Sequence, residues 1–488
     1  MLRTTLSRYP MSGGREKGKA IRLIQKCAQD KPAQDSPRAR TARALRSIFG
    51  MPARSSHRLP DTFPTRRMAG FAHPRRVLAL GLLVVPTLCV FADKSTVPTL
   101  IVVTALALPG AWLHGWRPSL PSHAALTLIA ATIGWIWIAS LWSFDPGESL
   151  VTSIQLLSLI VVAWLLSDSV VRVPDRGDPA GRGIARCAVT GIAAAAAALM
   201  IEMLFDMPIK TAVTGLWEDG GADASETNRG GTFLVVGLWL VLPLTALATA
   251  RPRLVALSLA VITVAAIAVS ESGTNKVALL AGAAFFALAW LGRPVRLTMW
   301  ASAICLGLIA IPWLAQAMFD AGLHEGDHLR FSVQHRIFIW HHVSDWAFEQ
   351  PWFGWGFDSS SAFPNRGIEP LPGYQSVIPL HPHNAALQIW LELGVVGLLL
   401  AVGVTARVAW RAEAAGNAWA PWLGAAAMSA LVAANLGYGI WQTQWIAALA
   451  WLTCYARLSL ALASEARASA SSTADKTAST GRSASRSP

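Results

Sequence analysis

The chain has few charged residues for its length. Asp, Glu, Lys and Arg make up 14% of its 488 residues, while 53% are hydrophobic. A glycine-rich phosphate-binding loop is also missing, so the sequence shows no site for ATP. The five cysteines are scattered along the chain without a pairing or zinc-ligand spacing: Cys27, Cys89, Cys187, Cys305 and Cys454. These absences argue against a soluble domain, a disulfide framework, a zinc site and ATP-driven chemistry.

Long apolar runs are abundant instead. They are about 17–25 residues long, the length that an α-helix needs to cross a bilayer. The runs are continuous rather than alternating, which excludes a transmembrane barrel. The sequence therefore predicts an all-α polytopic membrane protein with about twelve transmembrane helices. We expect these helices near residues 77–92, 97–113, 123–142, 150–171, 184–204, 231–249, 253–270, 274–291, 297–318, 385–406, 417–438 and 441–462.

The distribution of charge in the loops predicts the orientation. Loops on the cytoplasmic side of a membrane carry an excess of Lys and Arg. The loops predicted inside hold Arg117, Arg172, Arg176, Arg182, Arg251, Arg253, Arg293, Arg296, Arg407 and Arg411. The loops predicted outside are rich in acids: Asp145, Glu148, Glu218, Asp219, Asp223, Glu226, Glu325, Asp327 and Glu369. Both termini are therefore expected in the cytoplasm, and the two longest loops, 205–230 and 319–384, outside.

The net charge of +13 suggests nucleic acid at first sight. It is concentrated in residues 1–76, however, which also hold several prolines and no long apolar stripe. We interpret this segment as a disordered cytoplasmic arm rather than a nucleic-acid-binding domain. A later translation start, at Met51 or Met68, is an open alternative, and no cleaved signal peptide is predicted. The membrane domain then spans 77–463, and the Ser/Ala-rich residues 464–488 are predicted to form a disordered cytoplasmic tail.

The last long loop holds the sequence features with most chemical content. Apolar residues at helical spacing predict a short amphipathic helix over 332–348, between the ninth and tenth transmembrane helices. An aromatic turn, Pro-Trp-Phe-Gly-Trp-Gly, follows at 351–356. A polar stretch then leads to His-Pro-His-Asn at 381–384, directly before the tenth transmembrane helix. A titratable pair therefore stands at the membrane boundary. Nine residues then separate Asn384 from the glycine pair Gly394 and Gly397.

The order of these residues resembles the O-antigen ligase and O-antigen polymerase superfamily of bacterial envelope glycosyltransferases. The resemblance is strong over about residues 330–405 and also fits the expected number of helices. The residues that carry it are Arg336, Trp340, Pro351, Gly354, Gly356, His383, Asn384, Gly394 and Gly397. Weaker similarities occur at 141–146, 228–231 and 272–276.

The resemblance implies transfer of a glycan from a polyprenyl diphosphate carrier to an acceptor hydroxyl, without a nucleotide, cofactor or metal. It implies a site on the periplasmic face of the bacterial inner membrane, with membrane lipids as neighbours. The acceptor distinguishes the branches. A ligase moves the glycan to lipid A–core, a polymerase extends a glycan on the carrier, and an oligosaccharyltransferase modifies protein. The shared motif leaves these alternatives open, with the ligase-like label favoured.

The chemistry assigns roles to the cations. A diphosphate leaving group gains negative charge as the glycosidic bond breaks, and Arg binds two phosphate oxygens at once. Arg336 and Arg229 are the expected diphosphate-binding residues, together with Lys276, which keeps the charge but lacks the arginine fork. The simpler alternatives are a side chain reaching from a helix to the membrane interface for Arg336 and Lys276, and a solvated loop charge for Arg229.

His383 is the expected catalytic base, because histidine is the side chain most able to accept a proton near neutral pH. Asn384 either orients its imidazole or caps the tenth transmembrane helix, and a plain helix cap is the alternative for the pair. Trp340 is suited to an interface. Gly394 and Gly397 permit close packing or leave room for a lipid chain.

Two other classes remain as alternatives. A transporter would carry ionisable groups deep in its helices, and Glu392 is the one clear acid within a helix in the second half. A structural scaffold gives no reason for the Arg and His residues. His341 and His342 show no metal-ligand spacing with a partner, and we interpret them as interfacial.

Overall fold

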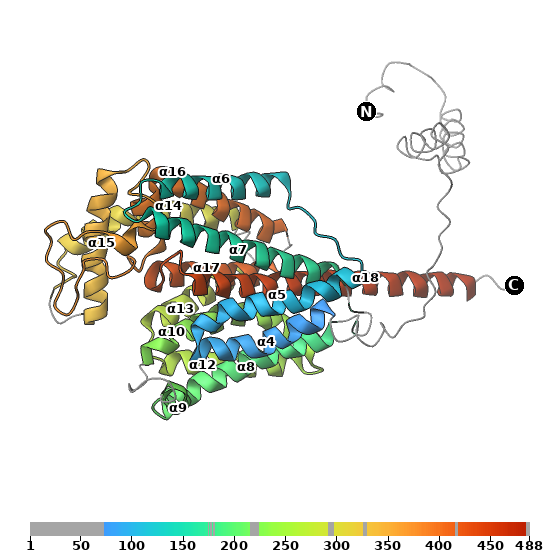
Figure 1. The fold of residues 1–488 in the computed structure, drawn as a ribbon. Coiled ribbons are helices and arrows are strands. Elements are labelled where there is room, and N and C mark those ends of the chain that lie inside the picture. Colours follow the sequence, from blue (N-terminus) through green and yellow to red (C-terminus); the bar gives the residue numbers. More distant parts are fainter. Residues whose placement is uncertain are drawn as a thin grey trace, which may run out of the picture. The chain divides into compact units, whose positions relative to one another are not determined.

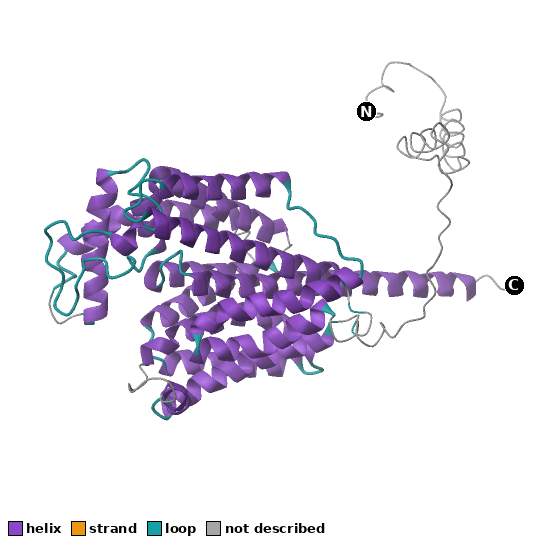
Figure 2. Ribbon diagram, viewed as in Figure 1, coloured by secondary structure: helices purple, strands orange, loops and turns teal. Residues whose placement is uncertain are grey.

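The computed structural model describes residues 73–173, 175, 178, 181–214, 224–290, 297–325, 329–414 and 418–484. Every regular element in these ranges is a helix (Figure 2). The predicted arm, residues 1–76, lies outside the described residues except for its last four. Its disorder therefore stays a prediction.

Twelve helices of the described chain are long and apolar enough to cross a membrane. They are α4 (Pro74–Phe91), α5 (Thr96–Leu113), α6 (His123–Ser140), α7 (Pro146–Arg172), α8 (Arg182–Leu204), α10 (Asn228–Val241, continued by η3 and α11), α12 (Pro252–Val269), α13 (Gly273–Trp290), α14 (Leu297–Asp320), α16 (Ala385–Ala414), α17 (Ala420–Gly437) and α18 (Thr443–Ala484). The shorter elements are η1 (Asp93–Ser95), α9 (Pro208–Thr214), η2 (Ala224–Thr227), η3 (Leu242–Leu244), α11 (Thr245–Ala248), α15 (Phe331–Glu349) and η4 (Ser359–Ala362). The prediction of an all-α, multi-pass membrane protein with twelve spans is confirmed.

Helix ends differ from the predictions by a few residues. Three larger differences are two interruptions within spans and one helix that is longer than predicted. Pro243 interrupts the sixth span, because proline lacks the N–H of a regular helical turn, and η3 joins α10 to α11 there. Gly394 breaks α16. The structure also continues α18 to Ala484, across most of the predicted tail, whose alanines favour helix. Disorder of this tail stays a prediction.

The spans pack in two groups (Figure 1). One group contains α6, α14 and α16, and the other contains α4, α5, α8, α10, α12, α13, α17 and α18, with α7 in contact with both and α16 also packed against α17. Small residues allow close approach in the second group. A side chain at Gly191 of α8 would collide with the backbone of α4 at Leu82. The Leu82 carbonyl also accepts a hydrogen bond from the buried Tyr455 hydroxyl of α18, at 2.9 Å.

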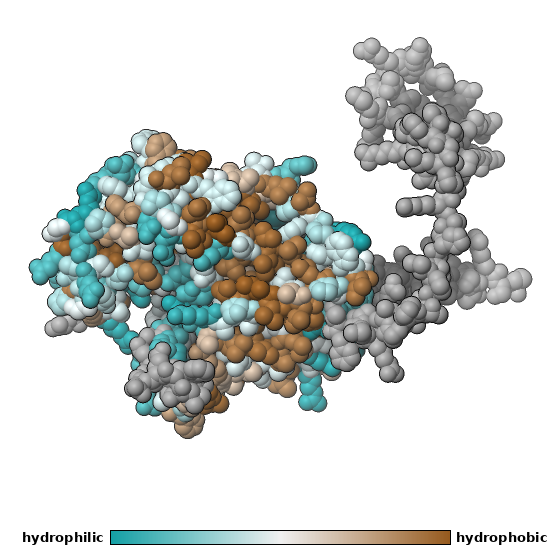
Figure 3. All heavy atoms as spheres, in the orientation of Figure 1, coloured by the Kyte–Doolittle hydropathy of each residue, from teal (hydrophilic) through white to brown (hydrophobic). Residues whose placement is uncertain are grey.

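The surface of the bundle is apolar around its middle. Hydrophobic side chains gather over the helices in Figure 3, whereas hydrophilic side chains cover the end that carries α15 and its loops. The exposed apolar residues include Leu80, Leu106, Leu257 and Leu280. A soluble protein rarely exposes so large an apolar surface, so this belt is typical of contact with lipid.

One end of the bundle is formed by the starts of α10, α13 and α16 and by the turn between α17 and α18. We call it the loop end. Here α15 packs against both α14 and α16 rather than lying alone. Its aromatic side chains join those of the loop that follows: Trp346 stacks on Phe363 with ring centroids 4.6 Å apart. The loop end contains most of the residues that the sequence predicts to be functional.

Candidate functional site

Residues 381–384 lead directly into α16 and hold two histidines in contact. His383 has a φ of 55°, in the left-handed region that residues other than glycine rarely adopt. Its backbone N–H donates to Nδ1 of His381 at 3.2 Å, and the two rings meet edge to face with centroids 4.3 Å apart. His381 is fixed in turn by the side-chain amide of Gln442, 3.0 Å from Nε2. Such backbone strain occurs often at functional sites.

Asn384 is the cap of α16. Its Oδ1 accepts a hydrogen bond from the backbone N–H of Leu387 at 3.0 Å, and its side chain is buried. In the described part of the chain it shares no hydrogen bond with the His383 ring. Of the two predicted roles, the structure therefore supports the cap, which sets the starting direction of α16.

Trp340 connects α15 to the histidine segment. Its indole N–H donates to the carbonyl oxygen of Pro382 at 2.9 Å, and only 9% of the residue is exposed. The sequence suggested an interfacial tryptophan, whereas the structure shows an internal anchor. Arg336 lies one turn earlier on the same face of α15. This single hydrogen bond therefore helps to fix the position of Arg336 relative to His383.

The His383 imidazole lies in a setting that favours its neutral form. Burial, and then the charge of Arg336, lower its pKa to about 4, although a hydrogen bond to the backbone of Gly437 opposes them. The pKa of His381 is lowered to about 3 by burial, by His383 and by the charges of Arg229 and Arg336. Within the described part of the chain, Nδ1 of His383 is buried without a hydrogen-bond partner. A neutral ring whose N–H donates to the Gly437 carbonyl leaves Nδ1 free to accept a proton.

Arg336 is a partly buried guanidinium beside this pair. Burial lowers its pKa, with a smaller opposing effect of Tyr374. It forms no ion pair with any residue that the structure describes. Its charge nevertheless lowers the pKa of His335 as well as those of the two histidines at 381 and 383. A guanidinium without an acidic partner in such a setting can bind a phosphate or carboxylate.

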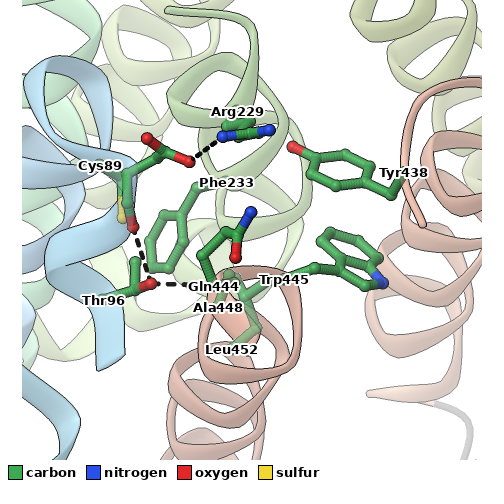
Figure 4. Close-up of a pocket in the computed structure, with 10 residues that line it drawn as sticks. Cys89, Thr96, Arg229, Phe233, Tyr438, Gln444, Trp445, Ala448 and Leu452 are labelled. Carbon is green, nitrogen blue, oxygen red and sulfur yellow. Dashed lines mark hydrogen bonds and ion pairs between the residues drawn. The ribbon is translucent and has the colours of Figure 1, made fainter. Parts of the chain in front are cut away.

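Arg229 lies at the start of α10 and already has an acidic partner. Its Nη1 is 2.5 Å from Oδ2 of Asp93, and 39% of its side chain is exposed. It lines a cavity of about 20 Å³, in which Figure 4 shows its guanidinium directed toward the Tyr438 hydroxyl on the side away from the ion pair. A cavity of that size holds about one water molecule. Arg229 is thus near the histidine pair, since its charge lowers the pKa of both, but Asp93 neutralises much of its field.

The position of Lys276 is set by its buried neighbour Asn275, whose side chain fixes the start of α13. The Asn275 side chain accepts from the Thr232 hydroxyl at 2.6 Å and donates to the Asn228 carbonyl at 2.8 Å. These bonds join the start of α13 to the start of α10, beside Arg229. Lys276 is partly exposed and forms no ion pair within the described chain. It lies in the first turn of α13, beside the start of α10, and not on α15 or the histidine segment.

Gly394 allows the backbone of the aromatic turn at 351–356 to pack directly against the backbone of α16. Its φ of 60° and ψ of −158° break the helix, and an added Cβ would lie 2.5 Å from the carbonyl carbon of Trp352. The turn replaces the lost helical bonds. Trp355 donates to the Leu391 carbonyl at 2.8 Å, and Val395 donates to the Pro351 carbonyl at 2.8 Å. The predicted close packing is thus between a helix and a loop. Gly397 contacts Leu393 of its own helix instead.

Glu392 holds the segment directly after this turn, at the start of η4, a role that sequence reasoning missed. It is fully buried, and its carboxylate accepts hydrogen bonds from the Asp358 backbone at 2.8 Å, Gln388 at 2.9 Å, Trp441 at 2.5 Å and the Ser360 hydroxyl. These donors satisfy a buried carboxylate and join α16 to residues 358–360 and to Trp441. The one available signal was its position, two residues before Gly394.

The loop end thus brings together His383, Arg336, Trp340 and Asn384, with Arg229 next to them. The positive ends of α10, α13 and α16 meet at the same place. Helix N-termini favour anions, because their first N–H groups lack helical partners. The arrangement combines a neutral proton acceptor at the N-terminus of α16 with a cation on α15 that has no acidic partner in the described part of the chain.

Comparison with known proteins agrees with this architecture. The family model described as O-antigen ligase matches residues 257–402, a range that includes α15, the aromatic turn and His383. A Rickettsia felis protein named "Putative polysaccharide ligase" is 27% identical over 375 residues, covering 72% of this chain and 86% of the relative. A Rickettsia bellii protein of the same name is 24% identical over 407 residues, covering 77% of this chain and 96% of the relative.

Proposed function

We propose that the chain is an O-antigen ligase-like glycosyltransferase that uses a lipid-linked donor, and the family match over residues 257–402 and the relatives' printed names support this proposal. Its donor is a glycan on a polyprenyl diphosphate, and its acceptor is a hydroxyl group of a second glycan or of lipid A–core. The observation that carries the proposal is the pairing of His383, whose Nδ1 has no partner, with Arg336, which has no acidic partner within the described chain.

In the proposed reaction the acceptor hydroxyl oxygen attacks the anomeric carbon of the donor sugar. The bond from that carbon to the diphosphate oxygen breaks, and the diphosphate leaves on its polyprenyl chain. The hydroxyl proton passes to Nδ1 of His383. Arg336 stabilises the negative charge that develops on the leaving oxygen. Cationic side chains supply the positive charge in this scheme, so it needs no metal ion.

Donor binding would also make His383 a stronger base. The positive charge of Arg336 is one of the causes that hold the pKa of His383 at about 4. A diphosphate bound to Arg336 offsets that charge, and a negative group near an imidazole favours its protonated form. The pKa of His383 then rises toward the operating pH when the donor is present. Arg229 plays a smaller part, since Asp93 already binds it, and Lys276 guides the donor from the edge.

The proposed location is the bacterial inner membrane, with both termini in the cytoplasm and the loop end facing the periplasm. The excess of arginine in the loops at the opposite end supports this orientation. The apolar belt supports a position of the loop end next to the lipid headgroups, where the diphosphate of a lipid carrier would lie. The polyprenyl chain would then extend along the belt.

The relatives' printed names favour the ligase branch over the polymerase branch. Product analysis in the native host distinguishes them. Loss of a ligase leaves full-length glycans on the lipid carrier, whereas loss of a polymerase abolishes long chains on that carrier. Loss of glycans from protein alone would indicate an oligosaccharyltransferase.

The experiment is complementation of a deletion strain, followed by analysis of surface and carrier-linked glycans. Arg336→Ala is expected to abolish normal surface polysaccharide, and Arg336→Lys to restore it only in part, because lysine keeps the charge but not the fork. Arg330→Ala is the matched control, an exposed arginine at the start of α15. Normal polysaccharide from Arg336→Ala, at wild-type protein levels, would refute the proposal.

A further inference from the structure

A second group of titratable side chains lies on another face of α15. His341, His342 and Asp345 each offer one ligand atom, and these three atoms lie within 4.8 Å of one another. The sequence interpretation gave the two histidines no partner at ligand spacing. The structure corrects this interpretation, because Asp345 follows His341 by one helical turn and points back to it.

The distances suit a small divalent ion. Nε2 of His341 is 3.5 Å from Oδ2 of Asp345. Two ligands at bond lengths of about 2.0–2.1 Å and at a tetrahedral angle lie about 3.3 Å apart. The other carboxylate oxygen, Oδ1, accepts a hydrogen bond from Gln316 of α14 at 2.8 Å. This bond orients Oδ2 toward His341, as the outer partners of metal-binding carboxylates do.

Packing against aromatic side chains fixes the imidazoles of His341 and His342, and each ring offers a ligand atom. Phe319 stacks on His341 at 3.8 Å and on His324 at 3.7 Å, so the phenyl ring separates the two histidines. Nδ1 of His341 is buried without a hydrogen-bond partner. His342 meets the Phe338 ring edge to face, with ring centroids 4.6 Å apart, so its imidazole is also fixed by packing.

We propose that His341, His342 and Asp345 form a binding site for one divalent transition-metal ion of the zinc class. Two imidazoles and one carboxylate select such ions over Mg²⁺ and Ca²⁺, which prefer oxygen ligands alone. Three protein ligands leave a fourth position for water. The ion orders this part of α15, which the hydrogen bond from Gln316 to Asp345 already connects to α14.

This site is separate from the diphosphate site. His341 follows Arg336 by five residues, which corresponds to a rotation of about 140° around α15. The ion therefore acts on the placement of α15 and not on the transferred glycan. The site can exist whether or not the proposed transfer reaction is correct.

Metal binding to the full-length chain in detergent micelles, with any affinity tag removed, tests the site. Titration with Co²⁺ should give visible absorption that saturates at one ion per chain and disappears on adding Zn²⁺. Asp345→Asn and His342→Gln should each weaken binding about tenfold or more. His123→Gln, an exposed histidine at the start of α6, should bind as the wild type does.

A spectroscopic measurement on the wild type guards against variants that fail to fold. X-ray absorption of the Zn²⁺-loaded chain should show two imidazole ligands and oxygen ligands at bonding distance. The proposal is overturned if Co²⁺ produces no saturable signal, if both ligand variants bind as tightly as His123→Gln, or if fewer than two imidazoles surround the ion. Glycan transfer takes no part in these readouts, so failure here would leave the proposed function standing.

Discussion

Trp340 donates its indole N–H to the carbonyl oxygen of Pro382 at 2.9 Å, across 42 residues of sequence. One end of this bond is on α15, a turn after Arg336. The other end is the peptide directly before His383. The proposed cation and the proposed base therefore sit on two elements that a single tryptophan joins.

Replacing Trp340 with Phe should remove this bond while keeping an aromatic ring. The buried Pro382 carbonyl loses its partner, which costs about 1–3 kcal/mol of stability. Glycan transfer should fall by about tenfold or more, because the geometry between Arg336 and His383 loosens. Thermal unfolding in micelles and the transfer rate measure the two effects. Trp313→Phe is the control, since Trp313 of α14 is half exposed and its indole has no hydrogen bond within the described chain. Equal behaviour of the two variants would contradict the role of this bond.

Glu392→Gln tests the carboxylate that secures residues 358–360, directly after the aromatic turn. The side-chain shape is kept, but the new NH₂ group faces donors that need an acceptor. The variant should lose about 1–3 kcal/mol of stability, seen as a lower unfolding temperature. Glu369→Gln, on the exposed part of the same loop, should be neutral. If Glu392→Gln melted with the wild type, its hydrogen bonds would not matter for stability.

Gly394→Ala should be among the most damaging substitutions in α16. Alanine does not readily adopt a φ of 60° with a ψ of −158°, and its Cβ would lie 2.5 Å from Trp352 backbone. The aromatic turn would have to leave the helix, with loss of folded protein at ordinary growth temperature. Gly134→Ala in α6 meets no atom within 4 Å and should stabilise the chain by about 0.5–1 kcal/mol. Normal yield and activity from Gly394→Ala would show that the break in α16 is dispensable.

The decrease of kcat/KM at low pH, the acid limb of the pH profile, should report the protonation of His383. Its pKa lies at about 4 in the folded chain and at the ordinary 6.5 when unfolded. Between these values the unfolded chain binds the proton and the folded chain does not, so the contribution of His383 to stability is lost as the pH falls. His383 of the folded chain stays neutral between pH 6.5 and about 4, so kcat/KM should decline only near pH 4.

Arg336→Gln provides the comparison for this pH dependence. Removing the Arg336 charge raises the pKa of His383, so the acid limb of the residual activity should move to higher pH. Where that activity is too low, the unfolding temperature of the wild type relative to His383→Ala can be followed from pH 7 to 4. A limb at pH 6.5 that Arg336→Gln leaves unchanged would show that His383 is not the titrating group.

The sequence was sufficient for the architecture, because continuous apolar runs and polar breaks alone determine which segments can span a membrane. The site residues came from the resemblance over 330–405, not from periodicity. Neither the apolar pattern nor the resemblance could predict contacts between segments that are distant in the sequence. Asp93 pairs with Arg229 across 136 residues, and Glu392 binds a turn that precedes it by more than 30. Such partners depend on how the helices pack, which no local pattern encodes.

The most direct test of the central claim is glycan transfer by His383→Ala. The full chain is reconstituted with a polyprenyl-diphosphate-linked glycan and an acceptor, and transfer is compared with that of the wild type and of His123→Ala. We expect His383→Ala to fold, to bind the donor through Arg336 as before, and to transfer glycan at least about 100-fold more slowly, because a general base is lost. Transfer by His383→Ala at the rate of the His123→Ala control would contradict it.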